Sequence, residues 1–204
     1  MTFPARGLYA ITQTDHKSAD AIIADVAAAL RGGAAVVQYR DKNPIDAVSL
    51  ARQLLTLCQQ FNVPLLINDD IELAAQIGAD GVHLGREDGN IAHARARLGH
   101  AAIIGVSCYN SVAQALEAQT QGATYVAFGR FFPSSSKPLA APAQLETLQQ
   151  AKRVLTVPIV AIGGILPDNG AQLLAAGADV LAVIGGLFDT SPEQAARAYQ
   201  ALFL

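Results

Sequence analysis

Short runs of apolar residues, rich in valine and isoleucine, recur along the whole chain and alternate with longer segments of mixed polarity. In the longer segments, apolar residues recur with the period of an α-helix. Nearly continuous apolar runs are typical of strands that are buried on both faces of a parallel sheet. We expect strands at residues 8–12, 35–39, 63–67, 81–84, 103–107, 125–128, 158–162 and 180–184.

Capping signals mark the starts of several predicted helices. Ser18 precedes the first helical segment, Asn43 precedes a proline at the start of the second, and Ser191 precedes Pro192 at the start of the last. Serine and asparagine cap helix N-termini, and proline is favoured at the first helical position. Glycine follows several segments, as is common where a helix ends.

Eight strand–helix units of roughly 25 residues each predict a (β/α)8 barrel, also called a TIM barrel, as a single domain over residues 1–204. An open doubly wound α/β sheet is the alternative. That fold normally carries a glycine-rich turn after its first strand, and residues 12–15 (TQTD) stand in that place here. The barrel is therefore the favoured fold.

The composition narrows the classes of function. A formal net charge of −3 argues against a nucleic-acid-binding protein, which would carry a basic surface. No apolar run reaches the ~18 residues of a membrane-spanning helix, and the first residues lack the apolar segment of a signal peptide. Cys58 and Cys108 are too few for a disulfide framework, so we expect reduced thiols in a cytoplasmic protein. The four histidines show no zinc-ligand spacing.

Polar side chains gather where the predicted strands end, which is where the active site of such a barrel lies. After the second strand come Gln38, Arg40 and Lys42, and strand alternation directs all three to one side. Two cations beside an amide can bind an anion, whereas the alternative is a solvated charged loop. Because Gln38 still lies within an apolar run, its amide needs a partner, and we favour an anion site.

Carboxylates follow the third and fourth predicted strands. Asn68, Asp69 and Asp70 end the third strand, and Asp88 follows the fourth. Facing carboxylates repel each other, and a hard cation such as Mg²⁺ would relieve that repulsion while also binding substrate phosphate. The alternative is that Asp70 and Asp88 cap the helices that follow. Both interpretations hold if one aspartate of a pair caps a helix and the other binds metal.

Paired glycines end the seventh and eighth predicted strands, Gly163 with Gly164 and Gly185 with Gly186. These strands often form the phosphate site of a barrel, and glycine lets backbone N–H groups approach a phosphate closely. Structural glycines in tight turns are the alternative. The rim would then hold one backbone-built site for a monophosphate and one charged site for a metal-bound diphosphate. Two phosphorylated substrates meeting there indicate group transfer with diphosphate as the leaving group.

The segment 129–138 (GRFFPSSSKP) follows the sixth predicted strand. Two prolines limit its freedom, while three serines and a lysine offer hydroxyl groups, N–H groups and one positive charge. A flexible linker is one interpretation. Its place at the rim favours a lid that orders when both substrates bind, with Lys137 reaching the diphosphate.

Taken in chain order, these motifs resemble the thiamine phosphate synthase family over nearly the whole chain. The residues that carry the resemblance read LYAIT, QYRDK, INDD, GVHLGRED, GVSCYN, FGRFFPSSSKP, AIGGI and VIGGLF. The resemblance implies a (β/α)8 barrel that uses Mg²⁺ to join hydroxymethylpyrimidine diphosphate to hydroxyethylthiazole phosphate or its carboxylated form. It also implies a dissociative reaction, in which diphosphate leaves, a pyrimidine methyl cation forms and the thiazole nitrogen captures it.

The resemblance further implies roles for individual residues. The pyrimidine diphosphate site would comprise Gln38, Arg40, Lys42, Asn68, Ser107 and Lys137, and the substrate-binding residues would also include Tyr39 and Asp41. The thiazole phosphate site would comprise Ser134, Ser135, Ser136, Gly164, Ile184 and Gly185. Asp69 and Asp88 would hold Mg²⁺, and Lys137, Arg40 and Ser107 would act in catalysis.

Two places depart from the family pattern. Ser134 and Ser136 stand where the family commonly has threonine, and Ile184 with Gly185 replaces a frequent Val-Ser pair. The second change removes a hydroxyl group and leaves only backbone donors. Both departures bear on the affinity for the thiazole phosphate rather than on the type of reaction.

Three rival functions fit less well. The related thiazole tautomerase is associated with a histidine after the glycine of the sixth strand, where this chain has Arg130. A non-catalytic sensor of phosphorylated ligands would not need Asp69 and Asp88. A phosphosugar isomerase or epimerase needs a base beside a carbon acid, and no isolated carboxylate stands out. The sequence leaves open the preferred thiazole acceptor and the oligomeric state, including a homo-oligomer.

Overall fold

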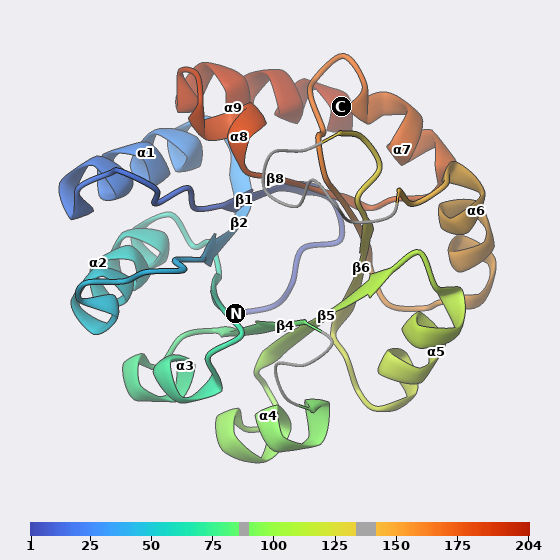
Figure 1. The fold of residues 1–204 in the computed structure, drawn as a ribbon, viewed down its shortest axis with the longest axis horizontal. Coiled ribbons are helices and arrows are strands. Elements are labelled where there is room, and N and C mark those ends of the chain that lie inside the picture. The colour runs from blue at the N-terminus through green and yellow to red at the C-terminus, as the bar shows by residue number, and fades with distance from the viewer. Residues whose placement is uncertain (86–89, 134–141) are drawn as a thin grey trace.

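The computed structural model consists of a closed ring of parallel strands surrounded by helices (Figure 1). It describes residues 1–85, 90–133 and 142–204. The strands are β1 (Gly7–Ile11), β2 (Ala34–Tyr39), β3 (Leu65–Asn68), β4 (Gly81–Leu84), β5 (Ile103–Tyr109), β6 (Tyr125–Gly129), β7 (Ile159–Ile162) and β8 (Val180–Val183). Each strand pairs with the next in chain order, and β8 pairs with β1 to close the ring. The predicted (β/α)8 barrel is confirmed, and the observed strand bounds lie within two residues of the predicted ones.

Helices follow the strands and form the outer layer (Figure 1). They are α1 (Ala19–Arg31), α2 (Ala47–Gln60), α3 (Ile71–Ile77), α4 (Ile91–Leu98), α5 (Val112–Thr120), α6 (Leu145–Val154), α7 (Gly170–Ala176), α8 (Gly185–Phe188) and α9 (Pro192–Gln200), with a 3₁₀ turn η1 (Ala201–Phe203). The one-turn helix α8, directly after β8, was not predicted. Within the described ranges, no helix combines the length and the apolar character needed to cross a bilayer.

The predicted helix starts are correct at Ser18 and Ser191 and wrong at Asn43. Ser18 caps α1 with its side chain, and Ser191 occupies the N-cap position of α9, although its side chain makes no capping bond. Helix α2 begins three residues later than predicted, because Asp46 accepts a hydrogen bond from the Ser49 N–H at 3.0 Å. The backbone N–H of Asn43 instead donates to Asp41 in the turn after β2.

The side chains pack in two layers. The larger apolar core lies between the strands and the surrounding helices. A smaller one fills the barrel and comprises Tyr9, Ile11, Val36, Leu66, Ile103, Tyr125, Ala127, Val160, Val180 and Ala182. The N-terminal segment, which runs to the middle of the ring in Figure 1, places Phe3 against the Tyr125 ring, with the centroids 4.0 Å apart. Phe3 thereby packs against the interior core of the barrel.

Candidate active site

The carboxyl ends of the strands surround a cavity of about 1020 Å³. Of the predicted site residues, those that line it are Gln38, Arg40, Asp41, Lys42, Asn68, Asp69, Ser107, Gly164, Ile184 and Gly185. Tyr39 is buried in the outer core instead, and its hydroxyl lies 3.5 Å from the Asp41 carboxylate. Asp88, Ser134, Ser135, Ser136 and Lys137 lie outside the described residues.

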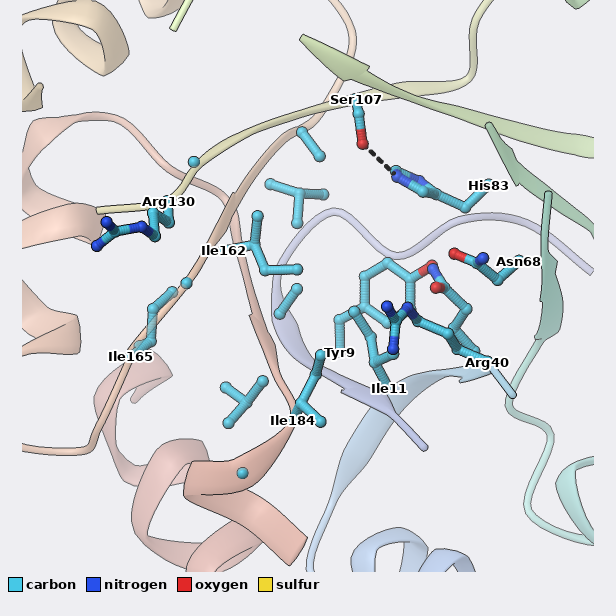
Figure 2. A pocket seen from close by; sticks show the side chains of 18 of the residues that line it. Tyr9, Ile11, Arg40, Asn68, His83, Ser107, Arg130, Ile162, Ile165 and Ile184 are labelled. Carbon is cyan, nitrogen blue, oxygen red and sulfur yellow. Dashed lines mark hydrogen bonds between the residues drawn. The ribbon is translucent and has the colours of Figure 1, made fainter. Parts of the chain in front are cut away.

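Arg40 is held at the rim through its backbone. The buried hydroxyl of Thr12 accepts a hydrogen bond from the Arg40 N–H at 2.8 Å and donates one to the Arg40 carbonyl oxygen at 2.9 Å. This double contact joins the end of β1 to the end of β2. Arg40 lines the cavity together with Asn68, which comes from the next strand, and both are labelled in Figure 2. A cation and an amide therefore face the same part of the cavity.

The Asp69 carboxylate is fixed by two donors. The side-chain amide of Asn68 donates to one oxygen at 2.6 Å, and the backbone N–H of Gly85 donates to the other at 3.3 Å. The backbone of Asp69 adopts a left-handed conformation, with φ of 63°, and its N–H donates to the His83 carbonyl oxygen. Left-handed backbone is uncommon outside glycine, although aspartate tolerates it better than most residues. Non-glycine residues with left-handed backbone are found often at functional sites, so Asp69 is a candidate functional residue.

The neighbouring aspartate has a structural role. Asp70 occupies the N-cap of α3, where its carboxylate accepts a hydrogen bond from the Leu73 N–H at 2.8 Å. Helix α4 is capped in the same way by Asn90, which accepts from the His93 N–H at 2.6 Å. The two helices that follow β3 and β4 therefore take their caps from Asp70 and Asn90.

Asp69 is the candidate metal ligand at the end of β3, because it lines the cavity without capping α3, whereas the Asp70 carboxylate caps that helix. Among the described residues, no group of three or more histidine, cysteine, aspartate or glutamate side chains could enclose a metal ion. Mg²⁺ is usually bound through one or two carboxylates together with water and substrate phosphate oxygens. The Asp69 carboxylate, preorganised at the cavity wall, fits that mode of binding.

A chain of polar side chains crosses the barrel interior beneath the cavity. The Gln38 amide nitrogen lies 2.6 Å from the Tyr9 hydroxyl, which lies 2.8 Å from the Tyr125 hydroxyl. The Tyr125 hydroxyl lies 2.8 Å from Nδ1 of His83, and Nε2 of that ring lies 2.9 Å from Oγ of Ser107 (Figure 2). Burial raises the pKa of both tyrosines well above the ordinary value, so both remain protonated phenols. Tyr9, Tyr125 and His83 were not among the predicted site residues.

The glycine loop after β7 is tightly packed. Gly163 and Gly164 have φ values of 104° and 63°, which few other residues adopt. A Cβ atom on Gly164 would lie 2.3 Å from the carbonyl oxygen of Pro133. Glycine is therefore required here by the fold itself, and the same absence of side chains leaves the backbone open to a ligand.

Side chains behind this loop fix its position relative to the loop after β8. The Asn169 amide donates to the Gly164 carbonyl oxygen at 3.1 Å, and the buried Tyr199 hydroxyl donates to the Ile165 carbonyl oxygen at 2.9 Å. A Cβ atom on Gly186 would lie 2.7 Å from that same Ile165 oxygen. The two glycine loops thus form one packed wall at one side of the cavity.

The segments on both sides of residues 134–141 are tied to the rim. The N–H groups of Phe131 and Phe132 donate to the carbonyl oxygens of Ile162 and Gly163, at 3.2 and 3.0 Å. Beyond the segment, the Ala143 N–H donates to the Arg130 carbonyl oxygen at 2.7 Å. Of the predicted lid, residues 129–133 are described and residues 134–138 lie outside the described ranges, so the lid stays a prediction.

Apolar side chains complete the cavity between its charged side and its glycine side. Ile11, Ile162 and Ile184 face the cavity from β1, β7 and the end of β8 (Figure 2). This wall would exclude water from the space between two ligands bound at the two sides.

Comparisons with known proteins agree with this geometry. A family model described as thiamine monophosphate synthase matches residues 8–187. The chain is 49% identical to the thiamine-phosphate synthase of Methylococcus capsulatus, over 100% of this chain and 92% of that protein. It is 52% identical to that of Marinobacter nauticus, over 97% and 90%. Among solved structures, the thiamine phosphate pyrophosphorylase of Pyrococcus furiosus superimposes with a TM-score of 0.87 at 33% identity, covering 96% of this chain and 94% of that one.

Proposed function

The chain belongs to the thiamine monophosphate synthase family, and we propose that it joins hydroxymethylpyrimidine diphosphate to hydroxyethylthiazole phosphate, or its carboxylated form, at this rim. The reaction transfers a pyrimidinylmethyl group and releases diphosphate. The observation that carries the proposal is a single cavity with Arg40, Lys42 and Asp69 on one side and two glycine loops on the other. Its volume of about 1020 Å³ lies at the upper end of small-molecule sites, so it can hold two substrates together.

The diphosphate binds on the charged side. Arg40 and Lys42 supply positive charge from the end of β2, and by family resemblance Lys137 adds a third cation. Two unit charges 4 Å apart interact by about 4 kcal/mol at an effective dielectric of ~20. Binding of a diphosphate beside bare carboxylates would therefore be unfavourable. The positive charges of these cations make the electrostatic energy of binding favourable.

Asp69, together with Asp88 by family resemblance, would hold Mg²⁺ on this side. The ion would supply further positive charge to the leaving diphosphate. Asn68 has a supporting role, because its amide fixes the Asp69 carboxylate at 2.6 Å. Asp70 is left out of the metal site, since its carboxylate caps α3.

The pyrimidine ring lies deeper, against Gln38 and Ser107. Both side chains line the cavity, and both belong to the hydrogen-bonded chain in the barrel interior. An amide and a hydroxyl can match the amino group and ring nitrogen of an aminopyrimidine. The thiazole phosphate binds on the opposite side, at Gly164, Ile184 and Gly185, with Ser134, Ser135 and Ser136 by family resemblance.

The chemistry then follows from this arrangement. The bond between the pyrimidine methylene carbon and the diphosphate oxygen breaks, and its electron pair leaves with the oxygen. The electron-rich aminopyrimidine stabilises the resulting cation, and the thiazole nitrogen forms the new carbon–nitrogen bond. Arg40 and Lys42 stabilise the leaving charge, while the isoleucine wall keeps competing water away. Catalysis consists of charge stabilisation and positioning, without a general base.

We place this reaction in the cytoplasm. Cys58 and Cys108 are buried free thiols rather than partners in a disulfide, which supports a reducing compartment.

The test mixes purified protein with pyrimidine diphosphate, thiazole phosphate and Mg²⁺, and follows thiamine phosphate and diphosphate together. Equal amounts of the two products are expected, and neither product is expected when the thiazole phosphate or the pyrimidine diphosphate is replaced by buffer. If neither product forms in the complete mixture, the proposed function is wrong. Full activity in excess chelator would refute the metal role alone.

A further inference from the structure

The donor and the acceptor can be assigned in each hydrogen bond of the polar chain in the barrel interior. Within the described residues, the Tyr9 hydroxyl contacts only Gln38 and Tyr125 by hydrogen bonds, and the Tyr125 hydroxyl contacts only Tyr9 and His83. Each phenol carries one proton and can donate once. The structure places the amide nitrogen of Gln38, which can only donate, against Tyr9. Tyr9 must then give its proton to Tyr125, or that buried proton would have no acceptor.

The same argument assigns the protons of Tyr125, His83 and Ser107, as far as the cavity. Tyr125 accepts from Tyr9 and therefore donates its proton to Nδ1 of His83. A neutral histidine that accepts at Nδ1 carries its proton on Nε2, which donates to Oγ of Ser107 at 2.9 Å. Ser107 then keeps its own hydroxyl proton for a ligand. At the other end, the amide oxygen of Gln38 is the acceptor left at the cavity wall.

The residues around Tyr125 leave room for its hydroxyl to contact His83. Tyr125 is fully buried, and its ring centroid lies 4.0 Å from that of Phe3 and 5.7 Å from that of His83. A Cβ atom on Gly105 of β5 would lie 2.3 Å from the Tyr125 hydroxyl oxygen. Glycine at this position makes room for a phenol to reach from β6 to the histidine on β4. Figure 2 shows the last link, with His83 and Ser107 facing each other at the cavity.

We propose that His83 and Tyr125 are positioning residues, which set the direction of this chain so that Ser107 offers a proton and Gln38 offers a carbonyl oxygen to the aminopyrimidine. The inference rests on the proposed function for the identity of the ligand. An aminopyrimidine presents an amino group, which donates, beside a ring nitrogen, which accepts. The reverse direction, with the Gln38 oxygen facing Tyr9, would make Ser107 donate to His83. The two contacts would then be exchanged, with Ser107 accepting from the amino group and the Gln38 amide donating to the ring nitrogen.

The direct test is the tautomer of His83, measured by nitrogen-15 NMR on protein labelled at histidine. The chain has four histidines, and a His83→Gln variant assigns the signal. In the substrate-free protein, the hydrogen bonds to Tyr125 and Ser107 predict that the ring carries its proton on Nε2. A proton on Nδ1 would overturn the proposal. The measurement needs no substrate, so its outcome is independent of the proposed function.

Kinetics of Tyr125→Phe provide the second test. The variant keeps the ring and removes the hydroxyl that donates to His83. We expect kcat/KM for the pyrimidine diphosphate to fall about tenfold, as the loss of one hydrogen bond of about 1.4 kcal/mol would give, with KM for the thiazole phosphate within about twofold of wild type. Equal effects on both substrates, or none on either, in an active enzyme would refute a positioning role.

Thr124→Val is the matched control, because Thr124 precedes Tyr125 on the chain but lies outside the cavity. Its hydroxyl accepts a hydrogen bond from the Ile104 N–H at 3.0 Å, so the variant also loses one hydrogen bond of a strand residue. We expect a lower melting temperature with unchanged kinetics for both substrates. If Thr124→Val shows the same kinetic change as Tyr125→Phe, the effect is one of stability and the proposal fails.

Discussion

The side-chain amide of Asn68 donates a hydrogen bond to the Asp69 carboxylate across 2.6 Å. The other oxygen of Asp69 accepts from the Gly85 N–H, and the left-handed backbone at Asp69 turns the side chain toward the cavity rather than toward the helix that follows. Asp70, one residue later, turns to cap that helix. The two adjacent carboxylates therefore have different roles, and substituting each in turn tests the metal site.

Asp69→Ala is expected to lower kcat/KM with Mg²⁺ by at least about 100-fold, the rate equivalent of about 3 kcal/mol of lost charge stabilisation. The fold is expected to remain intact, because Asp69 lies at the rim and outside both apolar cores. Steady-state formation of thiamine phosphate measures the first effect, and thermal unfolding followed by circular dichroism measures the second.

Asp70→Asn is the matched control, since it removes the same charge from the adjacent position. Asparagine caps a helix about as well as aspartate, so both activity and stability are expected to stay near wild type. If Asp70→Asn loses as much activity as Asp69→Ala, the total negative charge of the rim matters and the assignment of Asp69 as the ligand is wrong.

Gly105→Ala is expected to destabilise the barrel. The added Cβ atom would lie 2.0 Å from Cζ of Tyr125, and overpacking of this kind costs roughly 1–3 kcal/mol. The melting temperature is expected to fall by several degrees. In a double-mutant cycle with Tyr125→Ala, the second substitution is expected to cost much less in the Gly105→Ala background, because the crowded ring is then gone. Strictly additive losses would contradict the packing described here.

The two cysteines are expected to be unreactive in the folded protein. Burial raises the pKa of both the Cys58 and the Cys108 thiol to about 12, and the thiolate is the reactive form. At pH 8, a chromogenic disulfide reagent is expected to label neither cysteine of the native protein within minutes. It is expected to label two thiols per chain after denaturation. Rapid labelling of the native protein would show that one thiol is accessible.

The strands could be predicted from sequence because their signal is local. A strand buried on both faces needs an unbroken apolar run, and the runs at β4 and β6 mark those strands almost to the residue. The start of α2 could not be predicted in this way. Asn43 was the predicted cap, but its backbone N–H donates to Asp41 in the turn after β2, and the helix begins after Asp46 instead.

The site could be predicted only in part, for the same reason. Gln38 and Asn68 lie at the ends of apolar strands and Arg40 directly follows one, so their place at the rim could be predicted from single strands. Tyr9, His83 and Tyr125 meet across three strands, and no local pattern records that contact. A signal was nevertheless present, since a histidine or tyrosine inside a buried strand needs a hydrogen-bond partner.

Gly185→Ser tests the departure from the family pattern after β8. A Cβ atom on Gly185 would lie 2.6 Å from a carboxylate oxygen of Asp189, which is the end of an exposed side chain that can rotate away. The new hydroxyl can donate to a phosphate, and a hydrogen bond to a charged group contributes about 1.5 kcal/mol. We therefore expect KM for the thiazole phosphate to fall roughly tenfold, while KM for the pyrimidine diphosphate stays unchanged.

Gly186→Ser, at the next residue, is expected to act in the opposite way. Its Cβ atom would lie 2.5 Å from the Tyr199 hydroxyl and 2.7 Å from the Ile165 carbonyl oxygen. Both atoms belong to a buried hydrogen bond that joins α9 to the glycine loop after β7, so neither can move without cost. This variant is expected to unfold at a lower temperature and to bind the thiazole phosphate less tightly. For the neighbouring variant Gly185→Ser, a change in the KM for the pyrimidine diphosphate alone would contradict the proposal. It would mean that the two substrates have been assigned to the wrong sides of the cavity.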